Sequence, residues 1–451
     1  MANEGYTQYF DNAKPNRAHW FIIIILGLGG FADFFNVSGV IAGGSLSMEA
    51  AFHVGTSSYA LIVALTNVFM LIGALVIGFF SDKLGRRKLF TIDLLVMFIF
   101  TFISIFSTNF TEFLVTRTIV SFVIGGDYAT AFPLISEFAP KLRRGKFLMI
   151  FWLLTNIGEL VGYITAWILD VNFGLSLTMI RLIIIVGIIP IILSLILRTI
   201  GLPESPRWLF KKGKFDELAK VIKDVTGNTV ITDELNKKVL GPNNKQVKKM
   251  HEMGSIVFLA IIIAIPLFVV ANSTGIMVYY YPVIFTFLHV NKIEAILFEA
   301  ILFIPSVLIV SFSIYFLDKI GRFLTVSIGM ILTIIGYLLI YLLHPSIVGL
   351  LLILLLLVPW IGLAEGPLIA VASEIFPTQS RSLFSGVQTA SWRLGFVALS
   401  YTLPLLIVAV GVGGMYAIES IFLIIALIIM IIFFRPRIKI KNKSLEEIEQ
   451  E

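Results

Sequence analysis

The sequence predicts an all-α integral membrane protein built from two similar six-helix halves. The 451-residue chain is 58% hydrophobic and only 14% charged, with a mean hydropathy of +0.97, whereas about a quarter of the residues in a soluble protein are charged. Most of its surface is therefore expected to face lipid. Apolar runs long enough to span a bilayer recur along the chain, and two charged motifs each occur twice at nearly the same offset.

The membrane spans follow from the apolar runs, because a helix needs roughly 20 apolar residues to cross the hydrocarbon core. Several runs contain an interior proline, among them Pro133, Pro266 and Pro305. Membrane helices tolerate such prolines where neighbouring helices satisfy the freed backbone groups. The twelve predicted spans are 20–42, 57–80, 88–107, 111–138, 147–170, 178–200, 254–286, 293–317, 323–343, 346–376, 382–410 and 413–434.

The distribution of basic residues predicts the orientation of these spans. With the N-terminus placed in the cytoplasm, 29 of the 34 Lys and Arg residues fall in inner segments, and the outer loops hold only Lys292. This is the positive-inside pattern. It predicts a multi-pass protein of the cell membrane with both termini cytoplasmic, and it accounts for the net charge of +6 without a nucleic-acid partner.

One long polar stretch divides the spans into two groups of six. Its apolar residues recur among charges at helical spacing, so it is expected to form short amphipathic helices rather than a further domain. We therefore expect an N-terminal half (1–200), a cytoplasmic linker (201–253), a C-terminal half (254–434) and a cytoplasmic tail (435–451).

The two halves share charged motifs. Asp-Lys-Leu-Gly-Arg at 82–86 recurs as Asp-Lys-Ile-Gly-Arg at 318–322, and the segment 137–143 is echoed by 374–381. Repeated halves with a binding site at their interface, near the middle of the bilayer, are typical of secondary transporters. The repeat therefore favours a transporter that works by alternating access.

These motifs resemble the major facilitator superfamily over essentially the whole chain. The segment Gly-Phe-Phe-Ser-Asp-Lys-Leu-Gly-Arg-Arg-Lys at 78–88 is similar to the superfamily's loop motif between helices 2 and 3. The segments 203–209 (Pro-Glu-Ser-Pro-Arg-Trp-Leu), 279–285 (Tyr-Tyr-Tyr-Pro-Val-Ile-Phe) and 444–448 (Ser-Leu-Glu-Glu-Ile) resemble the sugar porter branch. Gly-Gly-Asp-Tyr at 125–128 instead resembles the proton-coupled phosphate symporters.

The resemblance implies that the repeated charges form a network that ties the halves together while the cavity faces outward. Paired charges at a water interface are weak enough to release during a conformational change. The alternative is that these charges only anchor the topology. The predicted gating residues are Asp82, Arg86, Glu137, Arg143, Asp318, Arg322, Glu374 and Arg381.

Ionisable residues inside the spans are functional candidates, because a charge at the bilayer centre costs about 2.5–3.5 kcal/mol. Asp33 lies midway along the first span and Arg117 in the outer half of the fourth, so the two can reach a similar depth. Protonation of an aspartate that faces an arginine weakens their attraction and can thereby favour one conformation. The resemblance implies this arrangement, because proton-coupled sugar porters pair an aspartate on helix 1 with an arginine on helix 4. Two alternatives remain: Asp33 forms a structural ion pair, or it binds the substrate directly. The predicted proton-coupling residues are Asp33, Arg117 and Asp127.

The candidate substrate residues point to two chemical classes. Aromatic rings and neutral or acidic hydrogen-bonding groups suit a sugar, although Val269 and Val270 stand where sugar porters carry paired glutamines. The buried Arg393 suits a carboxylate or phosphate, or it neutralises Glu365 or Asp33. The predicted substrate-binding residues are Asn36, Tyr128, Asn156, Glu159, Asn272, Tyr279, Tyr280, Gln388, Trp392 and Arg393.

The sequence thus favours a proton-coupled symporter of a monosaccharide or polyol. The alternatives are a proton-coupled symporter of phosphate or an organic anion, and a non-transporting nutrient sensor on the same scaffold. No nucleophile–base arrangement or phosphate-cradling glycine loop indicates an enzyme, and a chain with no cysteine and five scattered histidines gives no reason to expect a metal or cofactor. The expected partners are the solute, the proton and the lipid bilayer, and the protein is expected to be a monomer.

Overall fold

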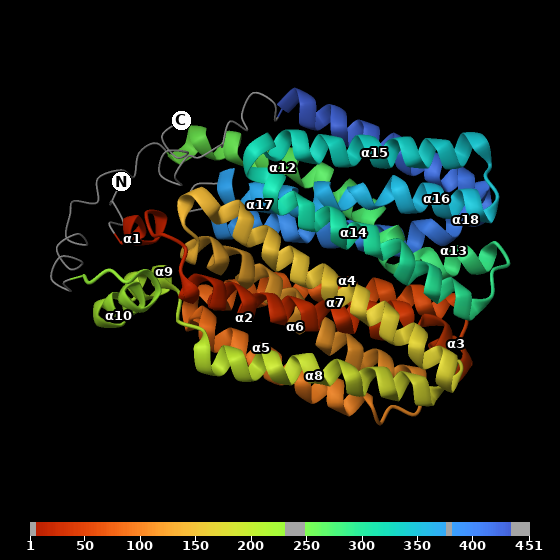
Figure 1. The fold of residues 1–451 in the computed structure, drawn as a ribbon, viewed down its shortest axis with the longest axis horizontal. Helices are drawn as coiled ribbons and strands as arrows, with labels where there is room; N and C mark the ends of the chain where they lie inside the picture. The colour runs from red at the N-terminus through yellow and green to blue at the C-terminus, as the bar shows by residue number, and fades with distance from the viewer. Residues whose placement is uncertain (1–5, 231–248, 376–380, 434–451) are drawn as a thin grey trace.

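The computed structural model describes residues 6–230, 249–375 and 381–433. Within these ranges the chain forms helices and their connections, with no strand. Figure 1 shows the long helices in two bundles, one from α2 to α8 and one from α12 to α18. The short helices α1, α9 and α10 lie together at one end of the molecule, which we call the linker end. The opposite end, where α3 and α13 lie, is called the far end.

The N-terminal bundle alternates in direction between the two ends, as the predicted spans require. Its first membrane helix changes from an α-helix to a π-helix halfway along, at Phe35. The elements are α1 (Thr7–Asp11), α2 (Arg17–Phe34), η1 (Phe35–Gly43), α3 (Ser45–Phe52), α4 (Thr56–Leu84), α5 (Arg86–Ser104), α6 (Phe110–Phe138), η2 (Lys141–Arg143), α7 (Arg144–Phe173) and α8 (Leu177–Gly201).

The linker and the C-terminal bundle follow. A second π-helix, η3, interrupts the first membrane helix of this bundle. The elements are α9 (Pro206–Lys211), α10 (Phe215–Thr226), α12 (Lys249–Gly275), η3 (Ile276–Tyr280), α13 (Tyr281–Phe287), α14 (Lys292–Ile320), α15 (Arg322–Leu343), α16 (Ile347–Leu356), η4 (Val358–Ile361), α17 (Gly362–Ile375) and α18 (Arg381–Phe433).

The twelve predicted spans are confirmed by these helices. By length and composition, ten helical stretches of the described chain could cross a membrane. The last of them, 387–433, bends at Gly411, whose φ of 72° and ψ of 174° are not helical, and it therefore provides two crossings. The helix α5 is the remaining span, and it is more charged than the ten because it carries Asp93 as well as the three basic residues at 86–88.

Small residues let α4 and α6 pack almost backbone to backbone. A Cβ atom on Gly73 would lie 1.7 Å from the carbonyl oxygen of Phe122, and one on Gly125 would lie 1.9 Å from that of Met70. Lipid provides no hydrophobic drive between helices, so such close contacts are a principal source of membrane-helix association.

The amphipathic helix predicted in the linker is α10. Its apolar residues Leu218, Ile222 and Val225 are buried against α1, α2 and α9. The Asn16 side chain, which caps α2, also donates a hydrogen bond of 2.6 Å to the Val225 carbonyl. The linker helices are thereby fixed to the N-terminal bundle.

Candidate functional site

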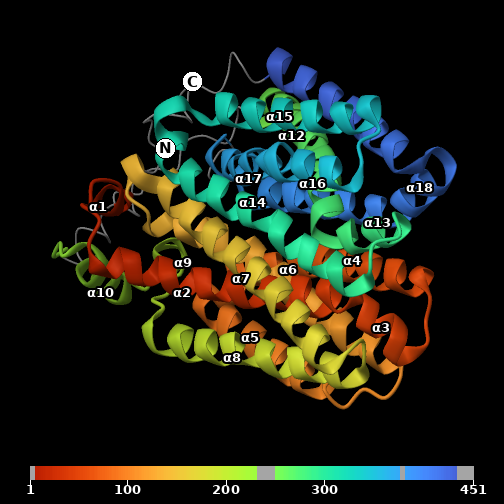
Figure 2. The same ribbon diagram turned by 45° about the vertical axis from the view of Figure 1, so that its right-hand side comes forward.

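Three aromatic rings join the two bundles in the middle of the molecule. The Trp392 ring of α18 lies 6.0 Å from the Tyr128 ring of α6 and 6.1 Å from the Trp152 ring of α7, measured between ring centroids. Within the C-terminal bundle the Trp392 ring packs against Phe396, with 5.5 Å between the ring centroids. Its indole nitrogen donates a hydrogen bond to the Glu365 carboxylate. The helix pairs α4–α18 and α7–α14 pack against each other where the two bundles meet (Figure 2).

Polar side chains of the C-terminal bundle lack hydrogen-bond partners within the described chain. The Gln388 side chain lies one helical turn before Trp392 and is 3% exposed, and neither its amide oxygen nor its amide nitrogen has a hydrogen-bond partner among the described residues. The same holds for the amide oxygen of Asn272 on α12. An unsatisfied buried polar group costs about 1–3 kcal/mol, so these groups are suited to bind a polar solute.

Arg393 is buried next to the same rings. Its guanidinium carbon lies 4.1 Å from the Trp392 ring centroid and 5.6 Å from that of Tyr128. Among the described residues it forms no ion pair, and two of its nitrogens, Nε and Nη2, have no hydrogen-bond partner. Glu365 and Asp33 both act on it electrostatically. The side chain therefore carries a positive charge in the joint between the bundles with free donor capacity.

The structure does not form the predicted pair of Asp33 and Arg117. The Arg117 guanidinium instead donates to the side-chain oxygen of Asn36 at 3.4 Å and to its backbone carbonyl at 3.3 Å. The switch from α2 to the π-helix η1 falls between Asp33 and Asn36. Asp33 stays in the α-helical part and faces another arginine, Arg198.

Asp127 and Arg198 form a buried bidentate ion pair. The two guanidinium nitrogens donate to the two carboxylate oxygens at 2.6 and 2.7 Å, and the guanidinium carbon lies 4.6 Å from the Phe90 ring centroid. A Cβ atom on Gly29 would lie 1.6 Å from Arg198 Nη2. A side chain at this position of α2 would therefore displace the guanidinium from its place beside Asp127. Asp127 thus contacts a neighbouring helix, α8, through its carboxylate.

Two more carboxyl groups surround this ion pair. Asp33 of α2 and Asp93 of α5 are both buried and interact electrostatically with Asp127 and Arg198. One oxygen of each, Oδ2, has no hydrogen-bond partner among the described residues. The acid cluster of Asp33, Asp93 and Asp127 therefore sets three carboxyl groups against one guanidinium. The excess of acids gives the cluster the capacity to take up and release a proton.

Two members of this cluster, Arg198 and Asp93, are not among the predicted site residues. Arg198 is three residues from the end of α8, where an arginine is expected to reach for the membrane surface. Asp93 follows the basic first turn of α5 by less than two helical turns, so it too suggests an interfacial position. The glycine at 29 could have indicated the site, because a glycine within a helix often marks a place where another group packs close to the backbone.

The predicted substrate residues divide into those near the central rings and those whose polar groups bind partners within their own half. Tyr128 and Trp392 belong to the central rings, and Arg393 lies over both of them. Gln388 stands one helical turn before Trp392, and the Tyr279 ring packs on Phe396 at 5.8 Å. Tyr280 donates to the Ser400 carbonyl within its own half. Asn36 is engaged by Arg117, as described above, and Asn156 donates to the Trp152 carbonyl of its own helix.

Hydrogen bonds close the joint between the bundles at the far end. The Tyr59 hydroxyl of α4 donates to the Tyr279 carbonyl at 2.5 Å, and the Tyr163 hydroxyl of α7 donates to the Val278 carbonyl at 2.7 Å. Both acceptors belong to the π-helix η3. The side chains of Glu49 and Lys292 add a peripheral ion pair of 3.8 Å.

At the linker end, the described part of the predicted gating network lies within the N-terminal half. Arg86 Nη1 pairs with Glu137 at 2.9 Å, and Ser205 donates to the other oxygen of Glu137 at 2.5 Å. Glu204 accepts from the backbone of Arg86 at 2.8 Å, and Arg143 is exposed. The predicted connection between the halves falls on side chains outside the described residues, namely Asp82, Asp318, Arg322, Glu374 and Arg381.

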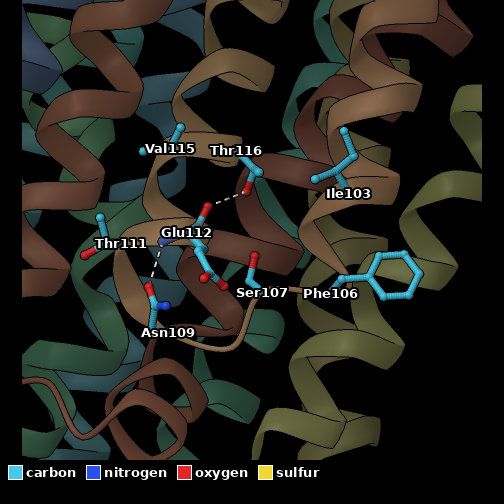
Figure 3. Close-up of a pocket in the computed structure, with 8 residues that line it drawn as sticks. All are labelled: Ile103, Phe106, Ser107, Asn109, Thr111, Glu112, Val115 and Thr116. Carbon is cyan, nitrogen blue, oxygen red and sulfur yellow. Dashed lines mark hydrogen bonds between the residues drawn. The ribbon is translucent and has the colours of Figure 1, made fainter.

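A pocket of about 610 Å³ lies apart from this joint, between the far ends of α5 and α6 (Figure 3). Glu112 lines it and accepts hydrogen bonds from the backbone and hydroxyl of Thr108 at 2.8 and 3.0 Å. The pocket belongs to the N-terminal bundle alone, and none of the predicted substrate residues lines it. We therefore place the candidate site at the joint between the bundles.

Comparison with known proteins agrees with this architecture. A family model described as "Sugar (and other) transporter" matches residues 22–451. The arabinose-proton symporter of Bacillus subtilis is 27% identical over 98% of both chains. The glucose transporter GlcP of Staphylococcus epidermidis is 27% identical over 96% of this chain and 98% of its own. These matches confirm the resemblance to the sugar porter branch.

Solved structures show the same fold. The proton:xylose symporter XylE, bound to 6-bromo-6-deoxy-D-glucose, has a TM-score of 0.80 at 22% identity and covers 96% of this chain and 98% of its own. An inward-open structure of XylE from E. coli has a TM-score of 0.72 at 23% identity, covering 96% and 99%. The chain therefore has the major facilitator fold with twelve membrane helices.

Proposed function

Because the chain belongs to the family of sugar and other transporters, we propose that it is a proton-coupled symporter of a monosaccharide or polyol. It is a multi-pass membrane transporter rather than an enzyme. In this proposal the solute binds between the two bundles, and the bundles rock about it to expose the site alternately to each side.

The solute class is inferred from the buried amide of Gln388, one helical turn before Trp392, which has no hydrogen-bond partner among the described residues. A sugar or polyol presents hydroxyl groups, each of which can both donate and accept, and a side-chain amide matches them with one acceptor and two donors. The rings of Trp392, Tyr128 and Trp152 supply apolar faces for the carbon skeleton. The Asn272 oxygen adds a further acceptor.

The acid cluster supports the coupling of transport to protons. A proton taken up by Asp33 or Asp127 removes one negative charge and weakens the attraction to Arg198. Because these residues stand on α2, α6 and α8, that change alters how three helices of the N-terminal half hold together. Loss of the proton on the other side of the membrane restores the original arrangement and completes the cycle.

Orientation and organisation complete the proposal. The far end faces outward and the linker end faces the cytoplasm, so that both termini are cytoplasmic. The halves 1–200 and 254–434 are the moving bodies, 201–253 connects them, and 435–451 is a tail. The linker-end charges form the latch of the outward-facing state. The transporter works as a monomer in the plasma membrane.

Arg393 favours a second candidate, a proton-coupled symporter of phosphate or an organic anion. Its Nε and Nη2 have no hydrogen-bond partner among the described residues and could bind two oxygens of such an anion in a fork. Glu365 acts against this, because its carboxylate lies close enough to offset the arginine's charge. We therefore rank the neutral solute first.

Uptake by proteoliposomes with an alkaline interior tests the proposal. Labelled hexoses, pentoses and polyols are compared with phosphate and small carboxylates. Accumulation of a neutral solute that stops when an ionophore collapses the pH gradient is the expected result. Accumulation of an anion alone would make Arg393 the substrate clamp. If the protein neither accumulates nor exchanges any of these solutes, the non-transporting sensor is favoured.

A further inference from the structure

One contact between the two bundles is made by close packing against a glycine. Gly366 of α17 is buried, and a Cβ atom placed on it would lie 3.1 Å from Cδ1 and 3.3 Å from Nε1 of Trp152 on α7. The same atom would lie 3.3 Å from Cε of Met149, about one turn earlier on α7. The α17 backbone therefore lies directly against these two side chains, and any side chain at residue 366 would have to displace one of them.

Both sides of this contact are held in place within their own bundle. Glu365, the residue before Gly366, accepts the hydrogen bond from the Trp392 indole. The Trp152 ring is 4% exposed and lies 6.4 Å from the Phe132 ring, measured between centroids. Because a packed interior adjusts little to added volume, the fit of the two bundles here depends on the absence of a side chain at residue 366.

The contact lies on the linker side of the joint. Trp152 follows Arg144, the first residue of α7, by eight residues, which is about 12 Å along the helix. Gly366 precedes the last residue of α17 by nine residues, and α17 ends toward the linker end (Figure 1). The predicted substrate residue Glu159, which is 3% exposed, lies about two turns beyond Trp152 toward the far end. Separation of Trp152 from Gly366 would therefore open the joint between that depth and the linker end.

This contact differs from the glycine contacts inside a bundle. Gly73 and Gly125 bring α4 and α6 together within the N-terminal half, whereas Gly366 and Trp152 belong to different halves. During alternating access a contact within one half persists, and a contact between the halves must form and break as they rock. We propose that Gly366 and Trp152 form the gate on the linker side, and that the joint closes there because residue 366 is glycine.

The proposal rests on the proposed alternating access, but not on the identity of the solute or on proton coupling. A larger residue at 366 would hold the bundles apart on the linker side, because overpacking is relieved by moving the packed surfaces apart. The far end would remain free to close through the hydrogen bonds of Tyr59 and Tyr163 to η3. The population should then shift toward the state that is open at the linker end.

Distances between spin labels at the linker end test the proposal. The chain has no native cysteine, so I200C at the end of α8 and I320C at the end of α14 place one label on each half at exposed positions. The measurement is made in liposomes without solute, because Trp152 also lines the candidate site. Gly366→Leu should shift the main distance between these labels to a longer value than in the parent protein.

A compensating variant separates gating from a general loss of structure. Trp152→Ala removes the ring that the new leucine would meet, so Gly366→Leu combined with Trp152→Ala should restore the short distance at the linker end. A second pair of labels, S57C and V410C, occupies exposed positions of the far end. In Gly366→Leu the distance between these two labels should not lengthen, because the two ends open alternately.

Gly362→Leu is the matched control. A Cβ atom on Gly362, about one turn earlier on α17, would lie 3.2 Å from Oγ of Ser306 and 3.4 Å from Cγ2 of Val310, both on α14 of the same bundle. This variant should leave the linker-end distance unchanged. If Gly366→Leu does not fold, Gly366→Ala should give a smaller shift in the same direction.

Three results would overturn the proposal: an unchanged linker-end distance in the Gly366 variant, an equal shift in Gly362→Leu, and a shift that Trp152→Ala does not reverse. Failure of the parent protein to accumulate a sugar would instead count against the proposed function alone, because these distances are measured without solute.

Discussion

Arg198 of α8 holds Asp127 of α6 in a bidentate ion pair with nitrogen–oxygen distances of 2.6 and 2.7 Å, deep inside the N-terminal bundle. The pair compensates one of three neighbouring carboxyl groups, and among the described residues Asp33 and Asp93 have no ion-pair partner of their own. A structural salt bridge would need only the first of these acids. The excess of acids over arginine is what suits the cluster to exchange protons.

The first prediction concerns Asp33. Asp33→Asn removes a titratable group from the cluster while keeping its size, so a proton gradient can no longer drive the cycle. We expect loss of gradient-driven accumulation, with solute exchange at equal pH on both sides retained in part. Both are measured with labelled solute in proteoliposomes. Glu112→Gln, at the exposed far end of α6, is the control. Accumulation by Asp33→Asn as strong as in the unmodified protein would contradict the assignment.

The second prediction concerns stability. Arg198→Leu leaves Asp127 buried without its partner, and removal of one member of a buried pair typically costs about 3–5 kcal/mol. We expect a clearly lower thermal unfolding midpoint in detergent. Arg181→Leu tests an arginine on the same helix that is only partly buried and forms no ion pair among the described residues. Equal midpoints for the two variants would show that the Asp127 pair does not stabilise the fold.

The third prediction concerns the solute. Gln388→Ala removes an amide that is free to bind hydroxyl groups, and loss of such a bond costs about 1–3 kcal/mol. The apparent affinity for the transported sugar should fall about tenfold, since 1.4 kcal/mol is a factor of ten. It is measured as the concentration that half-saturates uptake. Thr402→Ala, at an exposed position of α18, should not change it. An unchanged affinity in Gln388→Ala would remove Gln388 from the binding site.

The fourth prediction concerns the contact of α4 with α6. Gly125→Ala places a methyl group where the Met70 carbonyl oxygen would be 1.9 Å away, so the helices must separate. Overpacking typically costs about 1–3 kcal/mol, and we expect reduced yield and a lower unfolding midpoint. At Gly78 a Cβ atom would meet only Ala129, at 3.5 Å. Gly78→Ala should therefore be tolerated, and equal effects of the two substitutions would contradict the packing argument.

The sequence predicted the fold closely because its signals are large and local. Apolar length determined the spans, and the helices begin and end within a few residues of the predicted limits, as α6 (Phe110–Phe138) and α15 (Arg322–Leu343) show against 111–138 and 323–343. Helical spacing likewise predicted α10. These properties depend on the residues within one helix and on lipid around it.

The partners of buried charges were harder to predict, because they depend on rotation about the helix axis. Asp33 and Asn36 are three residues apart, yet the change to a π-helix at Phe35 leaves Arg117 with Asn36 and Asp33 with a different arginine. The Arg198 guanidinium occupies space that a side chain at residue 29 would fill, and residue 29 is glycine. The central group was more predictable, since Gln388 and Trp392 share one face of a regular helix.

The most direct test of proton-coupled sugar transport is the proton flux that the solute itself drives. A pH-sensitive dye is trapped in weakly buffered proteoliposomes with no imposed gradient, and a transported sugar is added outside. We predict that the interior acidifies with the protein present, and that Asp33→Asn gives no acidification. Sugar entry without any change of interior pH would contradict the account, because it would show a uniporter in which the acid cluster has only a structural role.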